Sequence, residues 1–480
     1  MYHLAIDIGA SSGRHILGHV EQGRIVLEEV YRFENRQQRR HGHDCWDLEA
    51  LWGHLLAGLR ACKAAGKLPA TVGIDTWAVD FVLLDEAGRL LGDAVAYRDA
   101  RTAGLREALE PALPFARHYA RTGIQYQPFN TAYQLAALRR EAPEQLDAAA
   151  HFLMIPEYFN YLLTGRIKNE YTNATSTALV NAESRSWDDE IIAALGLPRG
   201  MFGPLHLPGE EVGRFTPGVR AAVGFDCTVV LPATHDTGSA FLAVPALDSN
   251  AVTLSSGTWS LLGVENEAPI TTPESRAQNF TNEGGYQYRF RYLKNIMGLW
   301  MIQSIRRELN GEAYVAGKAP VVPAGGTYSY AQLEAEARAQ ASFPSRVDVD
   351  APRFLAPESM IAEVQAACAE GGFPVPQSVG ELMACVYHSL AGCYQKAVAD
   401  LSRLTGKTYT SINIVGGGSK DEYLNELTAK ATGTTVYAGP AEGTALGNLM
   451  VQFIGAGEFA GLQAARAAIR SSFLIKEVKP

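Results

Sequence analysis

The chain has 480 residues, of which 47% are hydrophobic and 19% charged, and a formal net charge of −9. This length predicts two or three domains, and the lack of a basic stripe argues against nucleic acid as the main ligand. No apolar run approaches the roughly 20 residues that cross a bilayer, and the N-terminus has no secretory signal pattern. We therefore expect a cytoplasmic protein with small-molecule ligands and no membrane or nucleic-acid partner.

The six cysteines are scattered and form no CxxC pair, which argues against a zinc site. Cys385 and Cys393 fall in one helical pattern and are expected to pack as small apolar residues. A Cys368–Cys385 bridge fits the sequence, although a reducing cytosol disfavours it.

The chain opens with a predicted strand, Tyr2–Ile8, a turn of small residues, and a second strand, Arg14–Val20. Glycine and small hydroxylated residues let backbone N–H groups line one side of a turn, and such turns bind anions. The turn contains Ala10, Ser11, Ser12 and Gly13. Asp7 is placed to hold a hydrated Mg²⁺ against a phosphate. By itself, the motif is explained equally well by an ordinary hairpin with Asp7 at a strand end.

The rest of the first half alternates strands and helices. Its predicted elements are strand Arg24–Phe33, helix Leu48–Ala65, strands Thr71–Asp75 and Phe81–Asp85, a mostly helical stretch Arg101–Leu163, and strand Thr228–Ala233. The pattern is interrupted at Val244-Pro245-Ala246, so we expect one domain over residues 1–245 and a second over 246–480.

The second half begins as the first does, with strand Ala251–Leu254, a small-residue turn, and strand Ser260–Glu265. It continues with helix Tyr387–Leu404, strand Ser411–Val415 running into Gly416–Ser419, strand Thr434–Ala438, and helix Thr444–Ile454. Ligands of open α/β sheets bind beyond the carboxyl ends of strands. Three small-residue turns at strand ends therefore predict a nucleotide held between two α/β halves; the alternative is three structural turns.

Asp236 is the candidate general base. It follows a predicted buried strand and lies between His235 and Thr237, where a helix is expected to start. A carboxylate with a reference pKa near 4 is ionised at neutral pH without special tuning and can take a proton from a hydroxyl. The alternative is a helix cap, a role that aspartate often has.

Two further segments predict polar contacts to a substrate. Trp77 and Asp80 follow a predicted strand and suit a polyol, although a core position for Trp77 is at least as good an explanation. The segment Lys294–Trp300 is expected to be helical, with Asn295 facing a sugar hydroxyl and Gln303, two turns along the same helix, reaching a nucleotide. The alternative for both is a polar residue on a helix surface.

Together these segments resemble the FGGY carbohydrate kinases of the actin–hexokinase superfamily, nearly from end to end. The matching segments are Asp7–Arg14, Gly73–Asp85, Tyr97–Arg101, Pro156–Gly165, Tyr171–Thr177, His235–Thr237, Ser255–Ser260, Thr281–Gly285, Lys294–Trp300, Gly416–Gly418 and Thr444–Asn448.

The resemblance implies an α/β fold of two ribonuclease-H-like domains, of the actin/hexokinase type, flanking a catalytic cleft. It implies ATP and Mg²⁺ as cofactors, with Asp236 as the general base. It assigns the nucleotide phosphates to Ala10–Arg14, other parts of ATP to Thr258, Gln303 and Gly417, and the ketose to His235, Thr237 and Asn295.

Within the family the motifs most resemble the branch that phosphorylates O1 of L-rhamnulose. One position departs from that pattern: Ala78 follows the Thr-Trp pair where glycine is usual. An added methyl group beside the sugar narrows the pocket, so another ketose, such as L-fuculose or a pentulose, stays open as the substrate. A non-catalytic sensor of ATP and sugar is the alternative outside the enzymes, and the sequence predicts no oligomeric state.

Overall fold

The structure is a computed structural model and describes residues 1–246, 248–312 and 327–480. Its contacts divide the chain into two compact units. The first consists of Met1–Pro245, Glu265–Leu293 and Gly443–Ser472, and the second of Ala246–Val264, Lys294–Glu442 and Phe473–Pro480. One division falls after Pro245, and the first unit also takes up two later segments of the chain.

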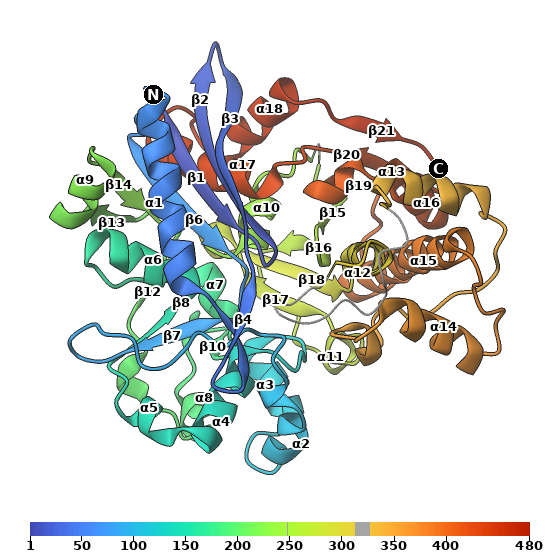
Figure 1. Ribbon diagram of the computed structural model, residues 1–480, viewed down its shortest axis with the longest axis horizontal. Helices are drawn as coiled ribbons and strands as arrows, with labels where there is room; N and C mark the ends of the chain where they lie inside the picture. The colour runs from blue at the N-terminus through green and yellow to red at the C-terminus, as the bar shows by residue number, and fades with distance from the viewer. Residues whose placement is uncertain (247, 313–326) are drawn as a thin grey trace. The chain divides into compact units, whose positions relative to one another are not determined.

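The first unit is built on a six-stranded mixed sheet with the order β13-β14-β6-β1-β2-β3 (Figure 1). Its strands are β1 (His3–Ile8), β2 (Ser12–Glu21), β3 (Arg24–Glu34), β6 (Thr71–Thr76), β13 (Glu211–Arg214) and β14 (Thr228–Val230). Strand β1 pairs antiparallel with β2 and parallel with β6. The opening strand–turn–strand prediction is therefore confirmed, and the turn lies at the carboxyl end of β1.

Helices cover both faces of this sheet. On one face lies α17 (Gly443–Gly455), where Gln452 Nε2 donates to the backbone oxygen of Leu4 at 2.9 Å. On the other face lies α1 (Leu48–Ala64), whose Leu55 oxygen is 3.3 Å from Nε2 of the buried His15. Because side chains alternate along a strand, these contacts fix which strand residues face each helix.

The remaining elements of the first unit surround the sheet or extend from it. They are β4 (Gln37–Arg40), β5 (His43–Trp46), β7 (Phe81–Leu84), α2 (Leu105–Leu109), α3 (Phe115–Thr122), α4 (Thr131–Glu141), α5 (Pro143–Asp147), β8 (His151–Met154), α6 (Ile155–Thr164), β9 (Asn169–Glu170), α7 (Tyr171–Thr175), β10 (Val180–Asn181), β11 (Ser186–Trp187), α8 (Asp189–Ala194), β12 (Leu205–His206), α9 (Pro217–Val223), α10 (Asp236–Leu242), α11 (Pro273–Ala277), β17 (Thr281–Gly284) and α18 (Leu462–Ser472). The mostly helical prediction for Arg101–Leu163 is confirmed in α2 to α6, but residues 123–130 are not helical and β8 is a strand, which pairs antiparallel with β7. Four residues in a helical context give no period that separates a strand from a helix.

The second unit has its own sheet, in which the strands follow the order β16-β15-β19-β20-β21. Its elements are β15 (Ala251–Ser256), β16 (Ser260–Asn266, entering the first unit at Glu265), α12 (Trp300–Leu309), α13 (Tyr330–Ala339), α14 (Met360–Glu370), α15 (Val379–Thr405), β19 (Ser411–Val415), α16 (Glu422–Thr432), β20 (Thr435–Ala438) and β21 (Lys476–Val478). Strand β15 is antiparallel to β16 and parallel to β19, as β1 is to β2 and β6. The repeated strand–turn–strand pattern of the sequence thus has the same local pairing in both units.

The helix expected over Lys294–Trp300 is wrong. Residues Phe290–Ile296 form strand β18, and α12 begins only at Trp300. Between them Gly298 has φ +62°, and a Cβ there would lie 2.5 Å from the backbone nitrogen of Ser260. The chain reverses at Gly298 because only glycine fits this turn, so Asn295 and Gln303 do not share a helix.

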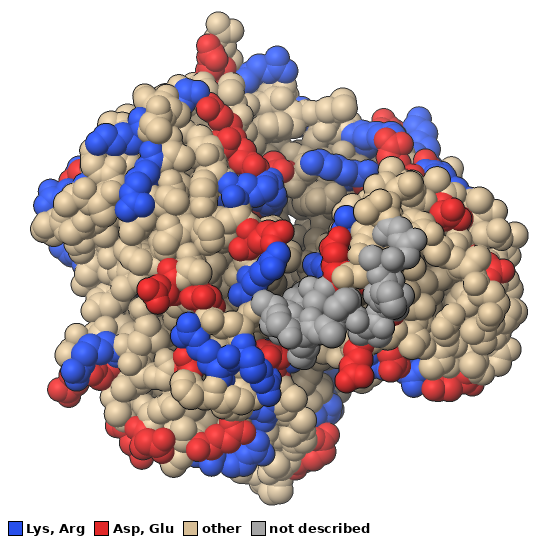
Figure 2. Space-filling view, viewed as in Figure 1, with Lys and Arg blue, Asp and Glu red and all other residues tan. Residues whose placement is uncertain are grey.

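Charged side chains of both signs are interspersed over the face of the molecule drawn in Figure 2. None of the helices in the described part of the chain combines the length and the apolar character needed to cross a membrane. The six cysteines are all free thiols, and Sγ of Cys368 lies 3.7 Å from Sγ of Cys385, within hydrogen-bond distance and without a disulfide bond.

Candidate active site

Asp236 is the first residue of α10, and its neighbours hold one of its two carboxylate oxygens. Oδ1 accepts from the Thr237 backbone nitrogen at 2.6 Å and from the Thr237 hydroxyl at 3.2 Å. Nε2 of His235 lies 3.3 Å from the same oxygen. Among the described residues no hydrogen bond or ion pair is made to Oδ2, and the side chain is 31% exposed. One oxygen is therefore fixed and the other is open to a substrate.

The pKa of Asp236 differs from the expectation. Burial raises its pKa above the usual value; His235 opposes this rise, and the nearby charge of Asp7 adds to it. The carboxylate is therefore tuned by its surroundings, whereas the sequence alone predicted an untuned group. A raised pKa brings a base closer to the operating pH, which favours proton transfer.

The helix that carries Asp236 is held at its far end and along its side. Arg466 on α18 donates to the backbone oxygens of Phe241 and Leu242 at the end of α10, at 2.9 and 3.0 Å. Along the side, α17 approaches so closely that a Cβ at Gly447 would lie 1.7 Å from the Ser239 oxygen. A short helix packed in this way presents its first residue in one orientation, which is what a general base requires.

Two buried glutamates hold the residue that precedes His235 and Asp236. The Thr234 hydroxyl lies 2.7 Å from Oε1 of Glu157 and 3.0 Å from Oε2 of Glu170. A hydroxyl has one hydrogen, so it satisfies both carboxyl groups only if one of them is protonated. Burial raises the pKa of Glu157 to about 8, which makes Glu157 the protonated member at neutral pH. Neither glutamate was predicted as a site residue, although Glu157 lies in the matching segment Pro156–Gly165, among apolar residues of a predicted helix.

We expect Glu157→Gln to remove a pH dependence of stability. The pKa of Glu157 is about 8 in the folded protein against 4.5 for an unperturbed glutamate, so its stabilising effect is complete below about pH 4.5 and is lost as the pH rises towards 8. Glutamine stays neutral, so at pH 9 the variant should be more stable than the unaltered protein by a few kcal/mol, at about 1.4 kcal/mol per pKa unit.

Calorimetry at pH 5 and pH 9 tests this expectation. Glu183→Gln, on the exposed turn between β10 and β11, is the matched control and should leave the pH dependence unchanged. If Glu157→Gln lost as much stability between pH 5 and pH 9 as the unaltered protein does, the raised pKa assigned to Glu157 would be contradicted.

The opening turn is closed by its own backbone and clamped by Asn35. The Gly9 nitrogen donates to the Ser12 oxygen at 2.9 Å. Nδ2 of Asn35 donates to the Gly9 oxygen at 2.9 Å, while its backbone nitrogen donates to the Ser11 oxygen at 3.0 Å. Asn35 lies just after β3, and no motif in the sequence singled it out. The turn is thus held in one shape from outside, which keeps its outer surface available to an anion.

Asp7, Arg14 and Asp75 lie side by side on the α17 face of the first sheet, since they are paired in the β1–β2 and β1–β6 registers. Nη2 of Arg14 donates to Oδ2 of Asp7 at 2.8 Å, and Nε donates to the same oxygen at 3.0 Å. Asp75 is fully buried, and its Oδ2 accepts from Nδ2 of Asn448 at 2.5 Å. Burial and the charge of Asp7 raise the pKa of Asp75 well above its usual value.

The structure favours the core explanation for Trp77, and Asp80 is buried beside it. Trp77 is 5% exposed and Asp80 is 1% exposed. Oδ2 of Asp80 accepts from the indole nitrogens of Trp46 and Trp77, at 2.6 and 2.9 Å. Ala78 between them is half-buried, and the next residue, Val79, has φ +66°. Asp80 therefore binds two indole N–H groups in the core. Of residues 77–80 only Ala78 is partly exposed.

Three predicted nucleotide segments come together in the second unit. The N-terminus of α12 bonds to the turn after β15, because the Trp300 nitrogen donates to the Thr258 oxygen at 2.9 Å. Oγ1 of Thr258 lies 3.5 Å from Oε1 of Gln303. The glycine turn after β19 packs on the same hairpin: a Cβ at Gly418 would be 2.0 Å from Oγ of Ser256.

Within the described part of the chain there is open space beside Gly417, and the side-chain oxygen of Asn295 is free to accept a hydrogen bond. Gly417 is exposed, and a Cβ there would meet nothing within 4 Å. Oδ1 of Asn295, at the end of β18, is buried and has no hydrogen-bond partner among the described residues. Asn295 belongs to the second unit, whereas Ala78, His235, Asp236 and Thr237 belong to the first.

Comparison with known protein families shows to which family the chain belongs. Residues 2–243 match the N-terminal domain of the FGGY family of carbohydrate kinases, and residues 252–456 match its C-terminal domain. The chain belongs to the FGGY family of carbohydrate kinases. The two-domain α/β fold implied by the sequence motifs is thereby confirmed, as is an enzyme that transfers phosphate to an alcohol group of a sugar.

Several FGGY relatives match this chain from end to end. A rhamnulokinase of Halalkalibacterium halodurans is 49% identical over 99% of this chain and 98% of the relative. Rhamnulokinases of Oceanobacillus iheyensis and Bacillus subtilis are 47% and 41% identical, over 98% and 100% of this chain and 97% and 96% of the relatives.

Solved structures show the same fold at low identity. The gluconate kinase of Lactobacillus acidophilus superposes with a TM-score of 0.78 at 16% identity, covering 100% of this chain and 93% of that one. The glycerol kinase of Plasmodium falciparum, solved with ADP, has a TM-score of 0.76 at 14% identity, covering 100% and 94%.

Proposed function

We propose that this protein transfers the γ-phosphoryl group of ATP to O1 of L-rhamnulose, giving L-rhamnulose 1-phosphate and ADP. The observation that carries the proposal is 41–49% identity to rhamnulokinases over nearly the whole chain. The contacts around Asp236 agree with it, because they leave one carboxylate oxygen open beside His235 and Thr237.

In the proposed reaction Asp236 takes the proton of the O1 hydroxyl as that oxygen bonds to the γ-phosphorus. The bond between the γ-phosphorus and the bridging oxygen breaks, and ADP leaves with the electron pair. Phosphoryl transfer depends mainly on positioning and on stabilising charge. We assign the positioning of the ketose to Ala78, His235, Thr237 and Asn295, with residues 1–245 carrying the sugar site and 246–480 the nucleotide site.

We assign the phosphates of ATP to the turn Ala10–Arg14. Its shape is fixed by Asn35, and its small residues leave backbone N–H groups accessible to anions. Arg14 donates to Asp7, so its guanidinium offsets the negative charge of that carboxylate beside the turn.

The FGGY family implies a divalent metal, which we propose to be Mg²⁺. The described residues contain no group of three or more His, Cys, Asp or Glu side chains arranged to hold a metal ion. This fits Mg²⁺, which keeps several waters and binds through one or two carboxylates and substrate phosphates. Asp7 is the residue we assign to it, through water. When bound, the ion neutralises charge on the phosphates.

We expect Gly417→Val to weaken ATP binding without unfolding the protein. A Cβ at Gly417 meets no described atom within 4 Å, so we expect the valine side chain to project into the space assigned to the nucleotide. The KM for ATP should rise on the order of tenfold, about 1.4 kcal/mol, with Tm nearly unchanged. Gly392→Val on α15, also exposed and open, is the control. An unchanged KM for ATP in Gly417→Val would contradict the assignment.

Coupled ADP release from purified protein with MgATP tests the substrate. L-rhamnulose is compared with L-fuculose, L-ribulose, D-xylulose and no sugar, and strong preference for L-rhamnulose is the expected result. Equal or better turnover of another ketose would reject L-rhamnulose, and Ala78→Gly would then show whether the extra methyl group is the cause. An absence of sugar-dependent ADP from protein that binds ATP would instead favour a sensor.

A further inference from the structure

The motif Thr281–Gly285 has no role in the reaction as described above, yet it places a charged side chain beside the catalytic pair. Glu283 on β17 and Arg291 on β18 face each other across the hairpin, since they are partners in its register. Oε2 of Glu283 lies 3.0 Å from Nη1 of Arg291. Arg291 is fully buried and Glu283 is 5% exposed. A buried ion pair is costly to desolvate, so its presence calls for an explanation beyond stability.

The pair is held rigidly against the start of α10. Nε of Arg291 donates to the backbone oxygen of Gly284 at 2.9 Å. A Cβ at Gly238, in the first turn of α10, would lie 3.7 Å from Cζ of Arg291. Although burial opposes its charge, Arg291 and His235 together lower the pKa of Glu283, which keeps it ionised.

The imidazole of His235 lies between this pair and Asp236. Its Nδ1 is 3.2 Å from Nη2 of Arg291 and 3.2 Å from Oε2 of Glu283. Its Nε2 is 3.3 Å from Oδ1 of Asp236. These three residues are the charged groups that face the ring in the described part of the chain. Hence both ring nitrogens have a charged neighbour.

The two partners of Nδ1 act on opposite protonation states. Arg291 can donate to a bare Nδ1, and Glu283 can accept from a protonated one. When Nδ1 is bare, the neutral ring carries its hydrogen on Nε2, where an ionised Asp236 accepts it. When Nδ1 is protonated, Asp236 accepts from Nε2 only if the ring is doubly protonated. The one state that is disfavoured has Nδ1 protonated and Nε2 bare, because the Nε2 lone pair would then face a carboxylate.

We propose, on the basis of the function proposed above, that Glu283 and Arg291 are positioning residues that keep a hydrogen on Nε2 of His235. That N–H holds Oδ1 of Asp236 together with the two donors of Thr237. Oδ2 is then the atom that takes the proton of the sugar hydroxyl, while the hydroxyl oxygen bonds to the γ-phosphorus and ADP leaves.

The first test needs no substrate. Protein labelled with ¹⁵N in histidine is studied by NMR, and His235→Asn identifies the signals of this ring. We expect Nε2 to be protonated at pH 7 and pH 8. A bare Nε2 in the unaltered protein would overturn the proposal.

The second test removes both charges at once, so that no unpaired ion stays buried. In Glu283→Gln/Arg291→Met the Nε2 hydrogen should be partly lost, and kcat should fall on the order of 10- to 100-fold with the KM for ATP unchanged. Unchanged kcat and Nε2 protonation in this variant would overturn the proposal. Arg291→Lys keeps the positive charge but loses the separate contacts of Nη1 with Glu283 and of Nη2 with His235. An intermediate kcat is expected.

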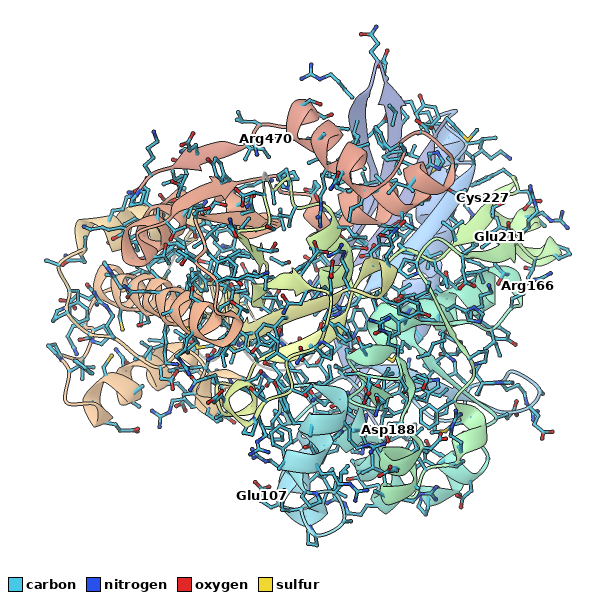
Figure 3. All side chains as sticks on the ribbon, turned by 180° about the vertical axis from the view of Figure 1, so that it is seen from behind. Glu107, Arg166, Asp188, Glu211, Cys227 and Arg470 are labelled. Carbon is cyan, nitrogen blue, oxygen red and sulfur yellow. The ribbon has the colours of Figure 1, made fainter. Side chains whose placement is uncertain are left out.

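The control is an ion pair elsewhere in the same unit. Nε of Arg121 donates at 2.7 Å to Oδ2 of the buried Asp188, which is labelled in Figure 3. Arg121→Met/Asp188→Asn should leave kcat within about twofold. If the unaltered protein showed no ketose-dependent ADP release but a protonated Nε2, the proposed function would fail and this contact would stand.

Discussion

Replacing Asp236 by asparagine is expected to lower kcat by about 10²- to 10⁴-fold, the usual contribution of a general base. Asparagine keeps the shape and the contacts of Oδ1 with Thr237, but its amide nitrogen cannot take a proton. ATP binding should be largely retained, because its assigned contacts lie elsewhere. The measurement is kcat with L-rhamnulose, alongside the Kd for ATP from calorimetry.

The pH profile sharpens this prediction. Asp236 works only when ionised, so kcat should fall as the pH drops through the pKa of Asp236. Because burial raises that pKa, the fall should come at a higher pH than for an ordinary aspartate. The acid limb should be missing from the residual activity of Asp236→Asn. Asp226→Asn, a surface aspartate paired with Arg214, is the control and should keep both kcat and the limb. Near-normal turnover of Asp236→Asn would refute the assignment.

The second large effect is expected at Gly447, where a single methyl group should destabilise the protein by about 3 kcal/mol or more. A Cβ there would lie 1.7 Å from the Ser239 backbone oxygen and 2.4 Å from its carbonyl carbon. Neither atom can move unless α10 shifts away from α17, and overpacking of this kind costs 1–3 kcal/mol even where side chains can yield. Because α10 begins with Asp236, the protein that still folds should also lose turnover.

Thermal unfolding and kcat of Gly447→Ala test this prediction. Gly455→Ala, at the end of the same helix, is the matched control, since a Cβ at Gly455 meets nothing within 4 Å. It should change stability by less than about 1 kcal/mol, in the stabilising direction. Equal Tm values for the two variants would show that α10 and α17 are not packed as described.

The sequence predicted the central strands of both units because their signals are local, and it missed shorter strands such as β4, β5 and β9 to β13. Strand β19 was predicted with its exact ends, and β1, β15 and β20 to within two residues. Each is a short run of apolar residues bounded by glycine or small polar residues, which is the signal that a buried strand gives. Strand β14 ends at Val230 and not at Ala233, since the strand pairing that would extend it is not formed.

The prediction of a helix over Lys294–Trp300 was wrong for a physical reason. Its apolar spacing fits a helix and a strand equally well, and what decides is the close approach of Gly298 to Ser260, about 40 residues earlier. No local pattern contains that contact. The resulting strand separates Asn295 from the helix that carries Gln303.

What the sequence by itself determined is the family, the small-residue turns at strand ends and the candidate base, because each is written in a few consecutive residues. Only the tertiary structure decided the electrostatic surroundings of the candidate base and of the charged residues near it. The raised pKa values of Asp236 and Glu157 and the contacts of Glu283 and Arg291 with His235 all depend on burial and on charges brought together from distant segments. Electrostatic effects act through space and are strengthened by the low dielectric of the interior, so they appear only once the chain is folded.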